Sequence, residues 1–396
     1  MAKHKWGWLL AAALIVVIGL VSFQQLTLVE APRKTDSVAA VPCNDISAPK
    51  CTIELVTGIR MAYLEAGALE GEVILLLHGL TDSSRSWFLV MPALLDMKPD
   101  LHLFALDQRG HGDTSMPSAT ECRSAPETCF RMTDFADDVV AFMKAKGIDR
   151  ATVVGHSLGS FVAQELALTH PEIVSRIVLV ASSTKVAGNA VVRDHVLTEP
   201  VEGAWKNALE AKGVAYPDGF YELTPQDADP NVEDWITNWY ADPVVTPELL
   251  KPFIPETARV KLGTWIGATK ALLATDNTER LESLSVPSLI IWGTQDSPFF
   301  QSDQASVKAS LDVAAASGKT SYYWKRYGVI PMPQSGQQLN DIGHGVPWEA
   351  PREVASDIIS FITIGRPTPH LYRSDAPNNL TTIVTERDQA EVVHNP

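Results

Sequence analysis

Continuous apolar runs recur along this chain, and segments with helical spacing separate them. The runs are EVILLLHGL (72–80), LHLFALD (101–107), ATVVG (151–155), SRIVLVAS (175–182) and VPSLIIWGTQD (286–296). An uninterrupted apolar run of this kind is typical of a strand that is buried on both faces. Strands that alternate with helices form a parallel sheet with helices on both sides. The sequence therefore predicts an α/β fold with a mostly parallel, doubly wound sheet.

The alternation stops over residues 184–285, where helix-like stretches occur but no buried-strand run does. We interpret this segment as a helical cap over the carboxyl-terminal edge of the sheet, inserted between two parts of the core, 51–183 and 286–365. A linker (24–50) precedes the core, and a polar, proline-containing stretch (366–396) is expected to be a loose tail. Four of the chain's tryptophans lie in the cap: Trp205, Trp235, Trp239 and Trp265. They either line an apolar pocket or form the cap's own small core.

The amino terminus carries Lys3 and Lys5 ahead of an uncharged, mostly apolar run over residues 6–23. This run is at the short end of what crosses a bilayer of about 30 Å. It is long for a cleaved signal peptide, and no small-residue cleavage site follows it closely. We therefore favour a signal anchor over a cleaved signal peptide for residues 1–23. Lysines on the amino-terminal side leave the catalytic domain extracytoplasmic, so the protein is expected to be membrane-anchored or exported.

The four cysteines form two close pairs in the sequence, Cys43 with Cys51 and Cys122 with Cys129. In an exported chain this pattern favours two small structural disulfide loops, although other pairings fit the same count. The spacings are not C-x-x-C and no histidine lies among them, so a zinc site is not expected. A net charge of −15 argues against nucleic acid as a partner.

A serine lies between two glycines in GHSLG (155–159), directly after one apolar run and ahead of a helix-like one. This matches G-x-S-x-G, in which a tight strand-to-helix turn exposes the serine hydroxyl above the sheet. The glycines are needed because a Cβ at either position would collide with neighbouring backbone. We therefore identify Ser157 as a candidate nucleophile. His156 points elsewhere in such a turn, and we interpret it as a packing residue.

A serine nucleophile needs a base, and the base needs an acid that orients it. Asp296 follows a predicted buried strand at the same sheet edge as Ser157, and His344 lies in a glycine-flanked loop before the last predicted helix. Their order along the chain, serine then acid then histidine, is the one that this turn requires. Asp303 and Asp341 are less suitable, because the first falls within a helix and the second is too close to His344.

A negative charge that develops on the substrate oxygen needs preorganised donors. One expected donor is the backbone N–H of Leu158, at the start of the helix that follows Ser157. The other is expected in the loop HGLTDSS (78–84), at the N–H of Leu80. His78 and Gly79 would shape that loop, since a glycine lets the backbone approach a substrate closely.

Taken together, these motifs resemble the α/β-hydrolase superfamily, in particular its members with a helical cap between the sixth and seventh strands. The resemblance covers about residues 52–364 and rests on LLLHGL, LDQRGHGDT, VVGHSLG, LIIWGTQD and IGHGVPWEAP in that order. It implies that the turn at 107–112 is structural and not catalytic. Two departures stand out: the loop between Cys122 and Cys129 enlarges the next connection, and an unusually long stretch precedes His344.

The resemblance also narrows the chemistry. Related dehalogenases and epoxide hydrolases carry an aspartate at the position of Ser157, whereas a serine suits attack on a carbonyl. We therefore expect hydrolysis of a carboxylic ester with an apolar acyl or alcohol group, a small-molecule substrate, without a metal or organic cofactor. A lactonase, an acyltransferase and a carbon–carbon bond hydrolase use the same three residues. A different class, a non-catalytic membrane-tethered binding protein, is the remaining alternative.

Overall fold

The computed structural model describes residues 49–240, 250–328, 342–374 and 383–387. By its internal contacts the chain divides into two units, 1–40 and 41–396, and every described residue belongs to the second. The predicted signal anchor or signal peptide (1–23) lies outside the described residues. Within those residues, no helix is both long enough and apolar enough to span a bilayer.

The described strands form one sheet with the order β1-β2-β4-β3-β5-β6-β7-β8-β9-β10. Their bounds are β1 Cys51–Glu54, β2 Arg60–Gly67, β3 Glu72–Leu77, β4 Leu101–Leu106, β5 Ala151–His156, β6 Val174–Val180, β7 Ser288–Gly293, β8 Tyr322–Tyr327, β9 His370–Ser374 and β10 Ile383–Arg387. Strands β3 to β8 are parallel to their neighbours in this group, and β2 pairs antiparallel with β4. The predicted mostly parallel sheet is therefore confirmed.

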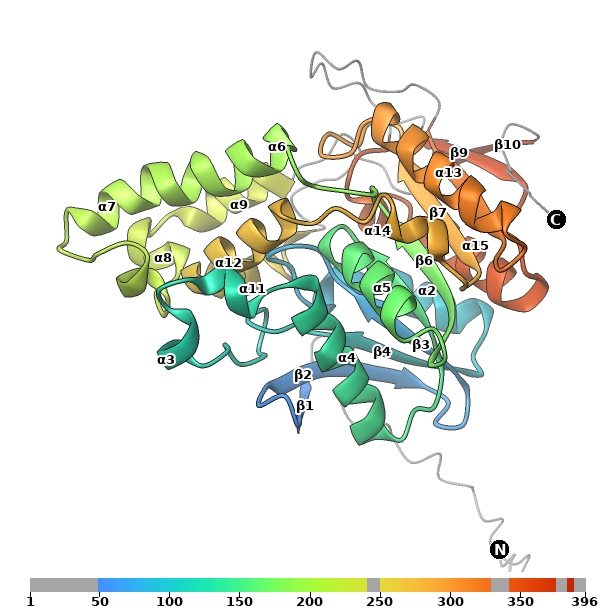
Figure 1. Ribbon diagram of the computed structural model, residues 1–396, viewed down its shortest axis with the longest axis horizontal. Helices are drawn as coiled ribbons and strands as arrows, with labels where there is room; N and C mark the ends of the chain where they lie inside the picture. The colour runs from blue at the N-terminus through green and yellow to red at the C-terminus, as the bar shows by residue number, and fades with distance from the viewer. Residues whose placement is uncertain (1–48, 241–249, 329–341, 375–382, 388–396) are drawn as a thin grey trace, which may run out of the picture. The chain divides into compact units, whose positions relative to one another are not determined.

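Helices cover both faces of this sheet (Figure 1). On one face lie α4 (Met132–Lys146), α5 (Leu158–Thr169) and α13 (Gln301–Ala316), and on the other lie α2 (Val90–Met97) and α15 (Pro351–Ile364). After Glu72 the residues of strand β3 are all apolar, because alternate side chains enter the two cores. Leu75 and Leu77 join one core and Ile74 and Leu76 the other.

Between β6 and β7 the chain forms a series of short helices. The segments are α6 Ala190–Val192, η3 Arg193–Thr198, η4 Pro200–Trp205, α7 Lys206–Glu210, η5 Asp218–Phe220, α8 Pro225–Ala228, α9 Val232–Tyr240, α11 Ile254–Arg259, α12 Leu262–Leu273 and η6 Arg280–Ser283. Of these, α6, α7, α8, α9, α11 and α12 lie beyond one end of the strands (Figure 1). They touch the loops after three parallel strands: Tyr240 meets the β3 loop, the Thr264 hydroxyl donates to Gly110 O, and Asn189 donates to Pro298 O.

The four cap tryptophans pack against one another. Ring centroids lie 5.1 Å apart for Trp205 and Trp265, 5.4 Å for Trp205 and Trp235, and 5.6 Å for Trp235 and Trp239. Trp265 is fully buried and Trp205 nearly so. Of the two alternatives that the sequence left open, the structure therefore favours a core of the cap over the lining of a pocket.

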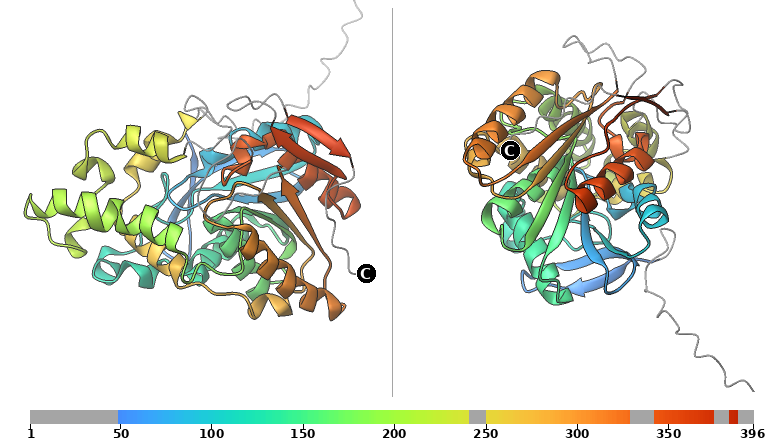
Figure 2. Two further views of the ribbon diagram at one scale, coloured as in Figure 1. Left: turned by 90° about the horizontal axis from the view of Figure 1, so that it is seen from above. Right: turned by 90° about the vertical axis from the view of Figure 1, so that its right-hand side faces the viewer.

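Two further predictions can be compared with the structure. The predicted loose tail (366–396) is wrong for its described residues, because β9 continues the sheet beside β8 and β10 pairs antiparallel with β9 (Figure 2). The disulfide between Cys122 and Cys129 is present, with a Cα–Cα distance of 5.9 Å. Cys51 is also disulfide-bonded. Its predicted partner, Cys43, lies outside the described residues.

Candidate active site

Ser157 lies in the turn between β5 and α5, with φ 51° and ψ −118°. A positive φ is costly for a side-chain-bearing residue and persists only where the surroundings impose it. Here the glycines on either side allow close backbone packing: a Cβ on Gly155 would lie 2.1 Å from Gly159 O, and one on Gly159 would lie 2.3 Å from Leu77 O. The backbone N–H of Ser157 donates to Val180 O at 3.0 Å.

The structure brings Ser157, His344 and Asp296 into one hydrogen-bonded chain, although up to 187 positions separate them in the sequence. His344 Nε2 lies 2.9 Å from Ser157 Oγ, and His344 Nδ1 lies 3.0 Å from Asp296 Oδ1. Because a carboxylate only accepts, Nδ1 carries the proton and Nε2 accepts from the serine hydroxyl. Ser157 is therefore next to a group that can take its proton.

The acid and the base differ in exposure. Asp296 is fully buried at the end of β7, and its Oδ1 also accepts from the Phe299 N–H at 3.0 Å. The His344 side chain is 21% exposed, so it remains reachable from solvent. The loop that carries it is anchored by buried Glu349, whose Oε2 accepts the Gly343 N–H at 2.8 Å. Sequence reasoning did not single out Glu349.

Of the two predicted oxyanion donors, Leu158 directly follows Ser157 in the chain, and Leu80 follows a residue that lies close to the serine. Leu158 is the first residue of α5, so its N–H is one of the helix's free amino-terminal donors. Gly79, which precedes Leu80, is close to the serine, since a Cβ on it would lie 3.3 Å from Ser157 Cβ. Gly79 O accepts from His78 Nδ1 at 2.7 Å, and His78 Nε2 accepts the Gln108 N–H at 2.9 Å. His78 thus shapes the loop, as predicted.

His156 is a packing residue and not a base. Its Nε2 donates to the backbone carbonyl of His344 at 2.9 Å, which holds the loop of the candidate base. Burial and the neighbouring His344 lower the pKa of His156 to about 3, against a smaller raising effect of the hydrogen bond to His344. The ring is therefore neutral over the whole range in which the protein is expected to work.

A second buried carboxyl group, Asp82, lies beside these residues and was not found from the sequence. It accepts hydrogen bonds from the Tyr240 hydroxyl of the cap and, through Oδ2, from the Gly79 N–H at 3.2 Å. Burial raises its pKa to about 6, an effect that the bonds from Tyr240 and Gly79 only partly offset. No motif marks such a residue, because its partner is 158 positions away in the cap.

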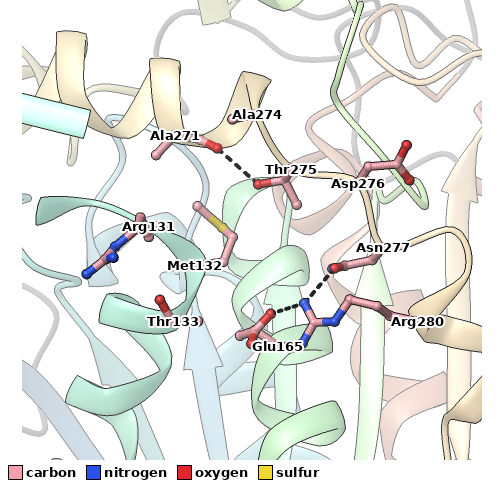
Figure 3. Close-up of a pocket in the computed structure, with 10 residues that line it drawn as sticks. All are labelled: Arg131, Met132, Thr133, Glu165, Ala271, Ala274, Thr275, Asp276, Asn277 and Arg280. Carbon is pink, nitrogen blue, oxygen red and sulfur yellow. Dashed lines mark hydrogen bonds and ion pairs between the residues drawn. The ribbon is translucent and has the colours of Figure 1, made fainter. Parts of the chain in front are cut away.

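A pocket of about 290 Å³ lies elsewhere on the protein, where the amino-terminal end of α4 meets α5 and the end of α12 (Figure 3). Its lining residues are Arg131, Met132, Thr133, Glu165, Ala271, Ala274, Thr275, Asp276, Asn277 and Arg280. The buried Glu165 within it is paired with Arg280 at 2.5 and 3.0 Å. None of Ser157, His344 and Asp296 lines this pocket, so it is separate from the candidate active site.

Comparison with known proteins matches residues 72–312 to the α/β-hydrolase fold. Rat bifunctional epoxide hydrolase 2 is 30% identical over 153 residues, which are 38% of this chain and 25% of that protein. Eight curated relatives that match, the rat protein among them, are covered over only 23–42% of their own length.

Solved structures resemble a larger part of the chain. An esterase from Exiguobacterium antarcticum has a TM-score of 0.57 at 16% identity, over 79% of this chain and 99% of that one. The enol-lactonase of Burkholderia xenovorans LB400 has a TM-score of 0.54 at 17% identity, over 79% and 100%. At identities this low, the similarity establishes the fold alone. With the family match over more than half of its length, the chain belongs to the α/β-hydrolase fold family and is an enzyme of that family.

Proposed function

We propose that this enzyme is a serine hydrolase that cleaves carboxylic esters. The observation that carries the proposal is the hydrogen-bonded chain from Asp296 through His344 to Ser157, set in a positive-φ turn at a helix amino terminus. In this arrangement Ser157 is the nucleophile, His344 the general base and Asp296 the group that orients the imidazole.

The proposed acylation step begins when Ser157 Oγ attacks the ester carbonyl carbon while His344 Nε2 takes the hydroxyl proton. The carbonyl oxygen then carries a negative charge, which the N–H groups of Leu80 and Leu158 stabilise. Collapse of this intermediate breaks the bond to the alcohol, which leaves with the proton from His344. Asp296 stabilises the imidazolium meanwhile, because its carboxylate accepts from Nδ1.

The second step regenerates the serine. Water attacks the acyl carbon while His344 Nε2 takes one of its protons, and the returning proton goes to Ser157 Oγ as the carboxylic acid leaves. The exposure of the His344 side chain allows water to reach it. A serine is suited to this cycle and not to epoxide opening, because an alkylated serine would be an ether, which water activated by His344 does not cleave.

An apolar acyl or alcohol group suits the surroundings of the triad. The Phe299 ring lies 5.7 Å from the His344 ring, Leu158 follows Ser157 in the chain, and Leu80 follows Gly79, which lies close to the serine. An internal ester, a lactone, presents the same carbonyl chemistry. The enzyme is further proposed to act outside the cytoplasm, attached to a membrane through residues 1–23, on the basis of the apolar run and the lysines before it.

Hydrolysis of p-nitrophenyl acetate, butyrate, octanoate and laurate tests this function, with Ser157→Ala beside the parent enzyme. We expect turnover by the parent and a loss of at least about 10³-fold in kcat in the variant. A folded parent that turns over none of these esters would contradict the proposal. Product analysis with and without an added acceptor alcohol separates hydrolysis from acyl transfer, since only transfer yields a new ester.

A further inference from the structure

The buried Asp82 is the point at which the cap meets the loop that carries one of the proposed oxyanion donors. Asp82 is only 2% exposed. A buried carboxyl group is costly unless it is hydrogen-bonded. Its partners therefore show what it is placed to hold.

On the core side, Asp82 holds the backbone on both sides of Gly79. Its Oδ2 accepts the Gly79 N–H at 3.2 Å, and its own N–H donates to Gly79 O at 3.3 Å. In a trans peptide the C=O and the following N–H point in opposite directions. Fixing Gly79 O therefore fixes the direction of the Leu80 N–H, the proposed oxyanion donor.

On the cap side, Asp82 accepts from Tyr240, the last residue of α9. Burial and the nearby Asp82 raise the pKa of Tyr240 well above its usual value, so the hydroxyl keeps its proton and acts as the donor. Its oxygen also lies 3.4 Å from Thr81 Oγ1, in the same loop as Leu80. The Tyr240 ring packs against Phe253, with centroids 5.4 Å apart, and this contact seats it within the cap.

We propose that Tyr240 and Asp82 form a positioning pair that couples a seated cap to a correctly aimed oxyanion donor at Leu80. When the cap is in place, the Tyr240 hydroxyl holds the Asp82 carboxylate, and the carboxylate and backbone of Asp82 hold the Gly79–Leu80 peptide. The inference rests on the proposed function. Neither residue touches the reacting atoms, so both are positioning residues.

The pair also has a charge that depends on pH. The titratable groups that face Asp82 are Tyr240 from α9, His156 from β5 and His344 from the loop before α14 (Val346–Glu349). An ionised Asp82 binds its two donors more strongly than a protonated one, because charge-assisted hydrogen bonds are the stronger kind. The Tyr240 bond lowers the pKa of Asp82. Removing the Tyr240 hydrogen bond therefore raises the pKa of Asp82. As the pH falls, any activity that needs ionised Asp82 is then lost at a higher pH than in the parent.

The test compares Tyr240→Phe with Tyr221→Phe in the full-length protein. Tyr221 is a matched control, because it is another buried cap tyrosine whose hydroxyl donates to a core carbonyl, Pro117 O at 3.0 Å. The measurements are the rate constant for labelling of Ser157 by a fluorophosphonate, kcat and KM for p-nitrophenyl acetate, and the dependence of both rates on pH. The labelling rate does not depend on which ester is the natural substrate.

We expect Tyr240→Phe to lower the labelling rate and kcat by about 10- to 100-fold, the cost of a small misplacement in a catalytic site. KM should change less than about 2-fold, since the pair acts on the oxyanion and not on substrate binding. The acid limb of the pH profile should move to higher pH. Tyr221→Phe should keep the parent's rates and pH profile. In an Asp82→Asn background the Tyr240→Phe change should add little, because the two residues act as one unit.

The possible failures are distinguishable. If Ser157 of the parent is labelled and Tyr240→Phe matches Tyr221→Phe in rate and pH profile, the inference is wrong and the proposed function stands. If Tyr240→Phe and Asp82→Asn lower the rate independently, so that their effects multiply, the pair does not act as a unit and the inference is also wrong. If the folded parent is not labelled at all, the proposed function fails and this inference fails with it.

Discussion

At the scale of single residues, the candidate active site divides into residues that motifs reveal and residues that only packing reveals. Ser157, Asp296 and His344 were predictable because each follows a local signal: a glycine-flanked turn, the end of a buried strand, and a glycine-flanked loop before a helix. Asp82 and Glu349 have no such signal. Both act through hydrogen bonds that the folded chain creates, Asp82 with Tyr240 and Gly79 and Glu349 with Gly343, and none of these follows from hydrophobic periodicity.

Replacing the orienting acid tests the role of Asp296. Asp296→Asn keeps the shape of the side chain but removes the charge that stabilises the imidazolium and selects the Nδ1–H tautomer. We expect kcat for p-nitrophenyl acetate to fall by about 10⁴-fold, as in other serine triads. Thermal unfolding checks that the variant is folded.

Asp303→Asn is the matched control for this change. Asp303 is the next aspartate along the chain, and its carboxylate caps α13 by accepting the Phe300 N–H at 2.8 Å. It takes no part in the chain from Ser157 to Asp296, so kcat should stay within about 2-fold of the parent. If Asp303→Asn were the inactive variant and Asp296→Asn the active one, the acid would be assigned to the wrong residue.

At the scale of elements, buried strands were the most predictable part of the fold, because an apolar run that enters two cores has few alternatives. Polar segments were less predictable. Helix α4 begins at Met132, and Asp134 in its first turn accepts the Arg131 N–H at 2.8 Å. Strands β9 and β10 extend one end of the sheet, with β10 at its edge, and lie in a polar stretch whose prolines suggested a tail. An edge strand needs no continuous apolar run, so composition did not reveal them.

The turn at Ser157 predicts a specific cost for a larger residue at Gly159. Gly159→Ala would place a Cβ 2.3 Å from Leu77 O and 2.7 Å from His78 O, so backbone must move. We expect the free energy of unfolding to fall by about 1–3 kcal/mol or more, as overpacking does elsewhere, together with ester hydrolysis. Urea denaturation and the p-nitrophenyl acetate assay measure the two effects.

Gly147→Ala provides the comparison. Gly147 ends α4 with φ 68°, and a Cβ there would have no neighbour within 4 Å. Its substitution therefore costs only backbone strain of about 1 kcal/mol and leaves the active site intact. If Gly159→Ala were as stable and as active as Gly147→Ala, the turn at Ser157 would tolerate a side chain at Gly159, and the expected clash would be contradicted.

At the scale of the whole molecule, an ion pair network connects the start of the described chain with the core and the cap. Lys50 Nζ lies 2.7 Å from Asp107 Oδ2 in the core and 2.6 Å from Glu256 Oε2 in the cap, and its side chain is 1% exposed. Arg85, from the loop after β3, also pairs with Glu256 at 2.7 Å. Lys50 was assigned to the predicted linker, because none of the neighbouring residues in the sequence indicates that the folded core would enclose its side chain.

Removing Lys50 should therefore destabilise the protein far more than its position in a linker suggests. Lys50→Met leaves the Asp107 and Glu256 carboxylates buried without their shared cation, a change that typically costs about 3–5 kcal/mol. Urea denaturation measures this loss. Lys98→Met is the matched control, because Lys98 pairs with the exposed Asp100. The free energy of unfolding of this variant should equal that of the parent within error. Equal stabilities of the two variants would contradict the role given to Lys50.

The central claim, that Ser157 is an activated nucleophile, is tested most directly by fluorophosphonate labelling followed by peptide mapping of the adduct. The account predicts one adduct, on Ser157, that disappears in Ser157→Ala and forms much more slowly in His344→Ala, because the hydroxyl then has no base. A folded parent that forms no adduct, or an adduct on another serine that persists in Ser157→Ala, would contradict it.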